Sequence, residues 1–486
     1  MAIAEKTICS FAMAASLLLA QAPAPSAGNS TEAAPAALVG LEVVAVDSSG
    51  QPVTDLTADD LKVTDQGKPE AIVCFRRNQA EVASLKPGEY SNRSAAPHHS
   101  AVVLFDLLNE SKTDVLDVWH GLDRLLPQIE SGDSLYFYIL TMEGTLNAIH
   151  AIGTSADDHT WNQQVAKVLD KTMKGAVHAR PLGMNDEECA KKTYVALETL
   201  GNQLAAFPGG RDIIWITNGI PNVWNPKTPC NGDWVDCALY VPHLAVTLDR
   251  DNAAVNPLSY TSNPDPGVAR DIEFMASLTG GKAYFQKDLP VVLKQVAQDA
   301  ATSYSIAYEP SPDNWDNKFH KVRVTCERKG VKLQAKQRYY AYLDNRPAAT
   351  KQQTAVGAAY HSPFDAAEVG LRATVTPSAG IPKSLHLEIR INPADLLLRE
   401  QLGHFADTLT FVSADLGATG PIGDPTVSSF NLDLTREQRD GVMKEGIPIA
   451  IDHPINDSIQ KVRLIVLDLA SNAVGSLTFP AGTARK

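Results

Sequence analysis

The sequence predicts an α/β fold built on a doubly wound, mostly parallel sheet, with a β segment before it and a β-sandwich-like domain after it. Continuous apolar runs alternate with helical patterns over 98–302, which is typical of parallel strands covered on both faces. Short β-rich runs separated by turns occupy 38–78, and alternating strands dominate 356–486. The length of 486 residues also exceeds the usual size of one domain.

The first residues, 1–27, predict an export signal and the start of a polar linker. Lys6 precedes an apolar run, Ile8 to Ala20, that is too short to span a bilayer comfortably. We therefore expect an exported protein, periplasmic or extracellular, that is not an integral membrane protein once the signal is removed. An uncleaved anchor or a soluble tail is the alternative.

The β segment at 38–78 contains three short β-rich runs joined by turns that combine an acid with glycine, "DSSG" and "DQGK". Such turns between β-rich runs indicate hairpins. The polar stretch from Ala80 to His99 follows and predicts a linker.

From Ala101 the pattern changes to alternating strands and helices. We expect strands at "AVVLF", "DSLYFYIL", "LNAIHAI", "RDIIWIT", "NAAVNPLSY" and "KAYFQ". Helical spacing predicts helices at "KTDVLDVWHGLDRLLPQI", "WNQQVAKVLDKTM", Asp186 to Ala206, "ALYVPHLAVTLDRD", "GVARDIEFMASLTGG" and "DLPVVLKQVAQDAAT".

Residues 303–342 return to β-strands, and Leu343 to Ala355 predicts a second linker. In the remaining 356–486, five alternating runs predict strands: "SLHLEIRI", "DTLTFVSA", "VSSFNLDLT", "KVRLIVLDL" and "AVGSLTFP". The one helical fragment expected there is "TREQRDGVMKEG".

Composition excludes some functions. The formal charge of −13 opposes non-specific binding to nucleic acid, and aromatic residues at 7% are not interleaved with basic ones. The nucleophile elbow G-x-S-x-G and the zinc motif H-E-x-x-H do not occur in the sequence. We therefore predict neither a nucleic-acid partner nor an enzyme, although a catalytic site dispersed along the chain stays open.

Cysteine usage leaves at least one thiol without an intramolecular partner. Removal of the signal leaves an odd number of cysteines, Cys74, Cys189, Cys230, Cys237 and Cys326. The candidate disulfide joins Cys230 and Cys237, which bracket the short polar loop "CNGDWVDC".

Ala101 to Asp288 resembles a von Willebrand factor type A (vWA) domain, and more narrowly the secreted VWFA-related group that is abundant in Acidobacteria. The segments "VDSSGQPVTDLTADDLKVTDQGKPEAIVCF", "LTGGKAYF", "SYSIAYEP" and "HKVRVTCERKGVKLQAKQRYY" are similar to segments of that group. The order of these segments along the chain is specific evidence for the resemblance, whereas each segment alone is weak evidence. The resemblance covers most of 40–342.

The resemblance implies a Rossmann-like sheet whose functional edge lies at the carboxyl ends of its strands. In A domains this edge often holds a metal-ion-dependent adhesion site with the motif Asp-x-Ser-x-Ser, a loop threonine and a later aspartate. Asp106 matches the first aspartate, but Leu108 and Glu110 occupy the serine positions. Asn218 replaces the later aspartate, so the motif is degenerate.

The loop threonine has no clear match, and Asn185 or Asp186 lies about where it would fall. Hard cations depend on the number and charge of their oxygen ligands. The oxygen ligands on offer to Mg²⁺ or Ca²⁺ are Asp106, Glu110, Asn218 and Asp186. The competing interpretation is that Asp106 and Asn109 or Ser111 satisfy backbone N–H groups at the start of a helix, which leaves a vestigial site and no certain cofactor.

The expected function is an exported binding or adhesion module that docks a protein through the carboxyl edge of its sheet. The residues expected at this edge are Asp106, Asn109, Ser111, Asn185, Thr217 and Asn218. The alternatives are a structural scaffold of a cell-envelope assembly and an enzyme with an unrecognised site.

Overall fold

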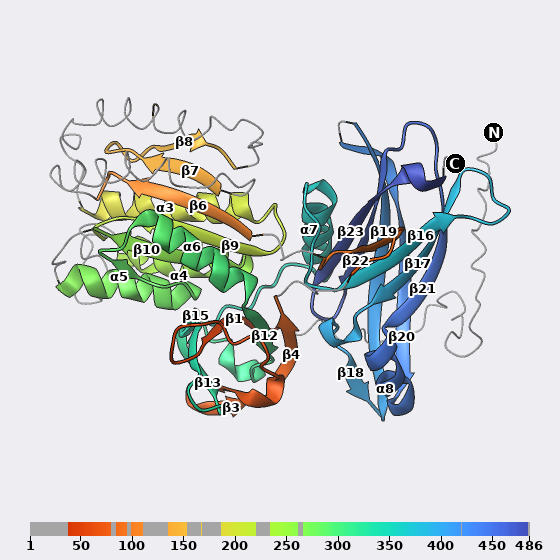
Figure 1. Cartoon of the computed structure of the whole chain (residues 1–486). Coiled ribbons are helices and arrows are strands. Elements are labelled where there is room, and N and C mark those ends of the chain that lie inside the picture. Colours follow the sequence, from red (N-terminus) through yellow and green to blue (C-terminus); the bar gives the residue numbers. More distant parts are fainter. Residues whose placement is uncertain are drawn as a thin grey trace. The chain divides into compact units, whose positions relative to one another are not determined.

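The computed structural model describes residues 37–78, 84–94, 99–109, 135–152, 167, 186–219, 234–260, 266–418 and 420–484 (Figure 1). The chain divides into two compact units. Unit 1 contains the described residues of Ala80–Ala96 and Arg346–Lys486, and unit 2 contains Ala37–Gln79 and Pro97–Asn345.

A six-stranded sheet forms one part of unit 2, in the order β11-β10-β9-β6-β7-β8. Its first five strands in this order run parallel, and β8 is antiparallel to β7. The strands are β6 (His99–Asp106), β7 (Leu135–Leu140), β8 (Leu146–His150), β9 (Gly210–Ile216), β10 (Ala253–Ser259) and β11 (Tyr284–Phe285).

Helices cover both faces of this sheet because alternate side chains of its strands form two separate cores. Val102 and Leu104 belong to one core with α3 (Asp186–Leu204), α4 (Trp234–Arg250) and α5 (Pro266–Thr279). Val103 and Phe105 belong to the other core with α6 (Leu289–Ala301). Burial on both sides explains the continuous apolar run of β6.

Two four-stranded antiparallel sheets form the other part of unit 2, in the orders β14-β1-β12-β4 and β15-β13-β2-β3. They share one hydrophobic core that includes Leu41, Val63, Tyr304 and Val322. The elements are β1 (Val39–Val46), η1 (Ala58–Asp60), β2 (Leu61–Asp65), β3 (Lys68–Glu70), β4 (Ile72–Arg77), β12 (Tyr304–Tyr308), η3 (Pro312–Asn314), β13 (Phe319–Cys326), β14 (Lys332–Ala335) and β15 (Arg338–Tyr340). The segments 38–78 and 303–342 therefore build one β structure together.

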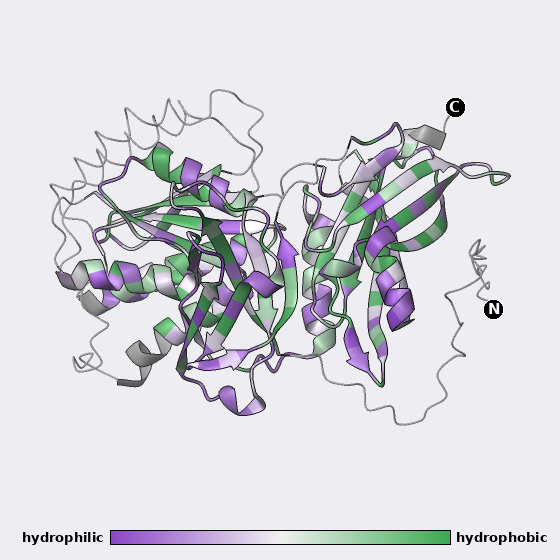
Figure 2. Ribbon diagram, turned by 60° about the horizontal axis from the view of Figure 1, so that its bottom comes forward, coloured by the Kyte–Doolittle hydropathy of each residue, from purple (hydrophilic) through white to green (hydrophobic). Residues whose placement is uncertain are grey.

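Unit 1 is formed by two antiparallel sheets that face a common core. One has the order β21-β17-β16-β5, and the other has the order β18-β19-β22-β23 with β20 paired to β19. Hydrophobic and hydrophilic residues alternate along these strands (Figure 2). The elements are β5 (Glu89–Ser91), α7 (Ala348–His361), β16 (Leu371–Pro377), β17 (Ser384–Ile391), η4 (Pro393–Asp395), β18 (Arg399–Gln401), β19 (His404–Gly417), β20 (Gly420–Thr435), α8 (Arg436–Glu445), β21 (Ile447–Pro454), β22 (Lys461–Asp468), β23 (Val474–Pro480) and η5 (Ala481–Ala484).

The predicted fold class, a doubly wound and mostly parallel α/β fold, is wrong for this chain. Its described residues form mostly antiparallel sheets, and parallel pairing is confined to one sheet of five. Local patterns identified most strands correctly. The error arose because antiparallel partners such as β1 and β12 are hundreds of residues apart, so their pairing leaves no local pattern.

The described residues of two segments expected to be linkers include regular elements. Within Ala80 to His99, β5 pairs with β16, and Arg93 is 5% exposed and forms an ion pair with Asp395 at 3.0 Å. Within Leu343 to Ala355, the helix α7 begins at Ala348 and packs against the outer face of the sheet that contains β22. Alanine-rich helices with few large apolar residues give a weak hydrophobic pattern, which explains the second error.

Within the described ranges, every helix is too short or too polar to span a bilayer.

Candidate functional site

The carboxyl ends of three neighbouring parallel strands place polar side chains at one edge of the six-stranded sheet. Asp106 ends β6, Thr217 and Asn218 follow β9, and Ser259 ends β10. The register of β6 on β9 brings Phe105 opposite Ile216, so the residues that follow are also neighbours. Ser259 Oγ donates a hydrogen bond to Asn218 Oδ1 at 3.1 Å, which connects the ends of β9 and β10.

The carboxylate of Asp106 accepts five hydrogen bonds from its own chain. Oδ1 accepts from the backbone N–H groups of Leu108 and Asn109, both at 3.1 Å. Oδ2 accepts from Asn109 Nδ2 at 2.6 Å, Trp215 Nε1 at 3.0 Å and Thr217 Oγ1 at 3.1 Å. The side chain therefore fixes the loop after β6 and ties it to β9.

Asp106 is 1% exposed, and burial raises the pKa of its carboxyl group, while the hydrogen bonds from Asn109, Trp215 and Thr217 oppose that rise. A carboxylate has about four lone-pair positions for hydrogen bonds or metal ions. Because five donors already occupy them, a cation could bind only by displacing donors. The described part of the site does not fit a divalent cation.

Two of the four proposed metal ligands have described side chains. Asp106 and Asn218 are described, and the amide oxygen of Asn218 already accepts from Ser259. Glu110 lies outside the described residues, and for Asp186 only the backbone, at the start of α3, is described. Among described residues, no group of three or more His, Cys, Asp or Glu side chains could hold a metal ion.

The edge residues predicted from the sequence differ in how far they reach the surface. Asp106 and Thr217 are buried, whereas Asn109 and Asn218 are half-buried, and the Oδ1 atom of Asn109 is itself buried. Ser111 and Asn185 lie outside the described residues, as does Cys230, and the side chain of Cys237 in α4 is not described either. The candidate disulfide therefore stays a prediction.

Two residues of this network were missed by sequence reasoning. Trp215 belongs to a buried apolar strand, and its N–H signals a polar partner, because buried indoles usually find one. Thr193 of α3 accepts from Asn109 Nδ2 at 2.8 Å and donates to the carbonyl of Cys189 at 2.9 Å. Nothing in the helical pattern of α3 distinguishes this threonine from an ordinary core residue.

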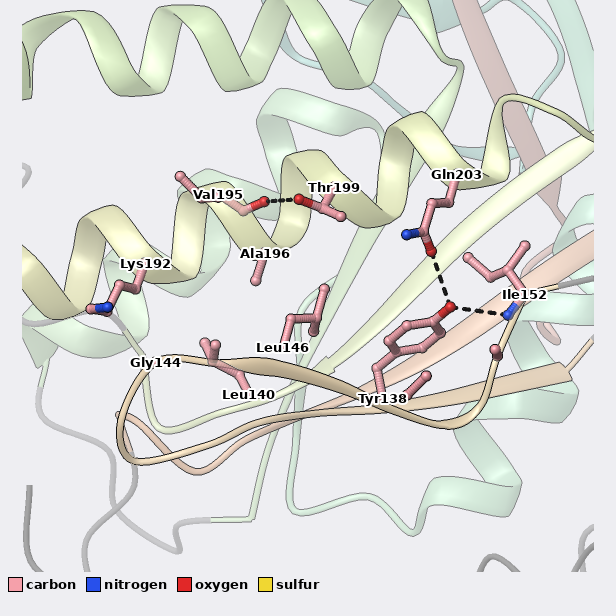
Figure 3. Close-up of a pocket in the computed structure, with 12 residues that line it drawn as sticks. Tyr138, Leu140, Gly144, Leu146, Ile152, Lys192, Val195, Ala196, Thr199 and Gln203 are labelled. Atoms are coloured by element: carbon pink, nitrogen blue, oxygen red, sulfur yellow. Dashed lines mark hydrogen bonds between the residues drawn. The ribbon is translucent and has the colours of Figure 1, made fainter.

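A pocket of about 540 Å³ lies beside the sheet, between the β7–β8 hairpin and α3 (Figure 3). Aliphatic side chains such as Leu140 and Leu146 line it, with Lys192 among the polar residues. At one side Tyr138 donates to Gln203 Oε1 and accepts from the N–H of Ile152, both at 3.0 Å. This tyrosine is fully used in holding the end of the hairpin to α3, so the pocket presents no assembled acid–base pair.

In unit 1, a chain of serine, histidine and aspartate resembles the side-chain set of a hydrolase. His453 Nδ1 lies 3.3 Å from Ser413 Oγ, and Nε2 lies 2.7 Å from Asp415 Oδ1. However, Ser413 sits inside β19, where its backbone is paired with β20 on one side and β22 on the other. His453 belongs to β21 of the opposite sheet and is 8% exposed. The three side chains therefore connect the two sheets inside the sandwich.

No protein-family model matches the chain, and no curated protein matches it. Among solved structures, it is similar to a von Willebrand factor type A protein from Catenulispora acidiphila, with 12% identity, 61% of this chain and 80% of that chain covered, and a TM-score of 0.29. It is also similar to the PilB minor pilin from Streptococcus sanguinis, with 12% identity, coverage of 45% and 64%, and a TM-score of 0.27. A third is the human COPII-coat protein Sec24c, with 9% identity, coverage of 81% and 46%, and a TM-score of 0.26.

Identities and TM-scores this low assign neither a family nor a function. One of these similar structures is a vWA protein, the family that the sequence resembles. The narrower assignment to an acidobacterial VWFA-related group has no support in these comparisons and stays a prediction.

Proposed function

We propose that the chain is an exported, non-catalytic binding module whose protein partner docks at the carboxyl edge of the six-stranded sheet. The contact surface is centred on the amide side chain of Asn218, and Asn109 holds the start of the neighbouring loop in place through Asp106 and Thr193. The buried carboxylate of Asp106 holds the residues of this surface in place through its hydrogen bonds with Asn109 and Thr217. Docking needs no metal ion.

The observation that carries this proposal is the network that joins the ends of three strands. Asp106 fixes the loop after β6 through Asn109 and reaches β9 through Thr217, while Asn218 is fixed to β10 through Ser259. Side chains held in this way lose little further freedom on binding, which lowers the entropic cost of an interface. Ligands of open sheets with parallel strands generally bind at this edge.

The chemistry of the edge favours binding over catalysis. A general acid or base must come within hydrogen-bonding reach of the proton that it transfers. Asp106 is 1% exposed and fully occupied by internal donors, so it cannot approach a bound reactant. The half-buried polar group that remains at this edge is the amide of Asn218, which donates and accepts hydrogen bonds but does not titrate.

Blocking the edge tests the proposal. Asn218→Arg places a bulky side chain on the contact surface, and Gln298→Arg adds the same group at an exposed position of α6. Each variant is immobilised and incubated with solubilised envelope proteins of the source cells, with and without EDTA.

We expect a partner retained by the wild type to be lost with Asn218→Arg, to be kept with Gln298→Arg and to be unaffected by EDTA. Equal retention by both variants would contradict docking at this edge. Loss of retention in EDTA would contradict the metal-independent contact.

Export is a separate part of the proposal and depends on the N-terminal signal. Cell fractionation of a tagged full-length chain should place it outside the cytoplasm in a shortened form. Accumulation of the full-length form in the cytoplasm would contradict export and would leave the docking edge untested.

A further inference from the structure

Two aspartates interrupt the hydrophobic core of the unit 1 sandwich. Asp407 of β19 and Asp468 at the end of β22 are 9% and 0% exposed. Both continue rows of core-facing residues, Phe405, Leu409 and Phe411 on β19 and Val462, Leu464 and Val466 on β22. The register pairs Leu409 with Asp468, so Asp407 lies diagonally across from Asp468 on the same face.

Asp468 is held by four donors from two loops. Its Oδ1 accepts from the N–H groups of Ala470 at 2.8 Å and Ser471 at 3.0 Å. Its Oδ2 accepts from the N–H of Leu397 at 2.9 Å and from Ser471 Oγ at 2.6 Å. This carboxyl group therefore fixes both the turn between β22 and β23 and the segment before β18.

Asp407 has a different environment. Its Oδ1 accepts from the N–H of Thr408 at 2.7 Å, whereas its buried Oδ2 receives no hydrogen bond from the described residues. The carboxyl of Asp468 and the backbone N–H of Ala470 are close enough to interact with the Asp407 carboxyl, and Ala470 already donates to Asp468 Oδ1 at 2.8 Å. Two carboxylate oxygens cannot hydrogen-bond to one another unless one of them carries a proton.

We propose that Asp407 and Asp468 share one proton in the folded sandwich, and that loss of this proton at alkaline pH loosens the turn 469–473. The pair would thus make the stability of unit 1 sensitive to pH. This inference depends on unit 1 alone and does not rest on the docking edge of unit 2.

Several charged groups lie on the surrounding elements, and the acids Glu437, Asp440 and Glu445 of α8 are exposed. Asp395 of η4 forms an ion pair with Arg93. Arg439 of α8 lies over the ring of Phe405, 4.5 Å from its centroid. The neighbouring strand β18 carries Arg399 and Glu400, and Glu400 forms an ion pair with Arg436 at 3.3 Å.

The direction of the pH effect follows from the difference between the pKa of Asp407 in the folded chain and its ordinary pKa in the unfolded chain. Burial and, secondly, the charge of Asp468 raise the pKa of Asp407 from its ordinary 3.8 to about 8. Between pH 3.8 and about pH 8 the folded state binds one more proton than the unfolded state, so the free energy of unfolding falls as the pH rises. The unfolding equilibrium changes by roughly tenfold per pH unit in this window and levels off above the folded pKa.

Asp407→Asn tests the proposal, because asparagine keeps the shape, supplies an N–H donor to Asp468 and does not titrate. Unfolding of the full chain by urea is measured between pH 5 and pH 10 for the wild type, for Asp407→Asn and for the control Asp433→Asn. Asp433 is an exposed acid on β20 that pairs with His404 at 2.8 Å.

We expect the ratio of the unfolding constants of wild type and Asp407→Asn to rise by roughly tenfold per pH unit from pH 5 towards pH 8 and to become constant above about pH 9. The corresponding ratio for Asp433→Asn should stay constant above pH 7. A pH-independent ratio for Asp407→Asn would overturn the shared proton.

Hydrogen exchange of the wild type gives a second measurement that does not require a variant to fold. The amides of Ala470 and Ser471 should lose protection between pH 7 and pH 9, after correction for the intrinsic exchange rate. Unchanged protection of these amides would overturn the loosening of the turn.

Discussion

Replacement of Asp106 by alanine should destabilise unit 2 strongly. The change removes the acceptor of five hydrogen bonds at a position that is 1% exposed. The hydroxyl of Thr217 can rotate towards another acceptor, and Asn109 Nδ2 keeps Thr193 at 2.8 Å. The N–H groups of Leu108, Asn109 and Trp215 lose the acceptor that Asp106 provides.

Each stranded buried donor costs about 1–3 kcal/mol. The removal of a buried, desolvated carboxylate offsets part of this cost, which gives an expected loss of about 3–5 kcal/mol in the free energy of unfolding. Asp106→Asn should lose less, because Oδ1 still accepts from the backbone N–H groups of Leu108 and Asn109. Its new amide group would, however, face the N–H of Trp215.

Urea unfolding of the full chain, followed by tryptophan fluorescence, measures these losses. Asp313→Ala is the control, since Asp313 is an exposed acid of the same unit. If Asp106→Ala unfolds within about 0.5 kcal/mol of Asp313→Ala, the five hydrogen bonds do not stabilise the fold as described. The carboxylate would then be free to serve a ligand.

Three further outcomes are expected. Millimolar Mg²⁺ or Ca²⁺ should leave the melting temperature unchanged, because Asp106 has no free lone pair, and a rise through ligand linkage would show a metal site. Thr435→Ala should cost about 1 kcal/mol in urea unfolding, because Thr435 accepts from the N–H of Gln438 as the N-cap of α8, and a loss near zero would refute that role. A fluorophosphonate probe should not label Ser413, since the serine is held within β19, and labelling abolished by His453→Ala would identify a hydrolase.

Local sequence patterns located most strands and helices but not the way in which they pair. The apolar run of β6 and the helical spacing of α3 and α5 were sufficient for their assignment, because burial imposes those periods directly. The antiparallel sheets combine segments such as β4 and β12, whose partners are set by packing rather than by sequence spacing. The first segment expected to be a linker was misassigned because three residues of β5 are too few to show alternation, and the second because the alanine-rich α7 has a weak hydrophobic pattern.

The candidate site was predictable in part. A carboxylate at the end of a buried strand requires partners, and that requirement identified Asp106 and the edge that it shares with Thr217 and Asn218. The choice between a ligand site and an internal network could not be made from the sequence. It depends on Trp215, which the apolar pattern of β9 identifies only as a core residue.

Site-specific photo-crosslinking in the source cells tests the docking edge most directly. A photoreactive phenylalanine analogue is placed at Asn218 in one variant and at Gln298 in a second. We predict a covalent adduct with one protein partner from position 218, unchanged by chelator, and no adduct from position 298. Adducts from position 298 alone, or none from either position while the partner still co-purifies, would contradict docking at the carboxyl edge.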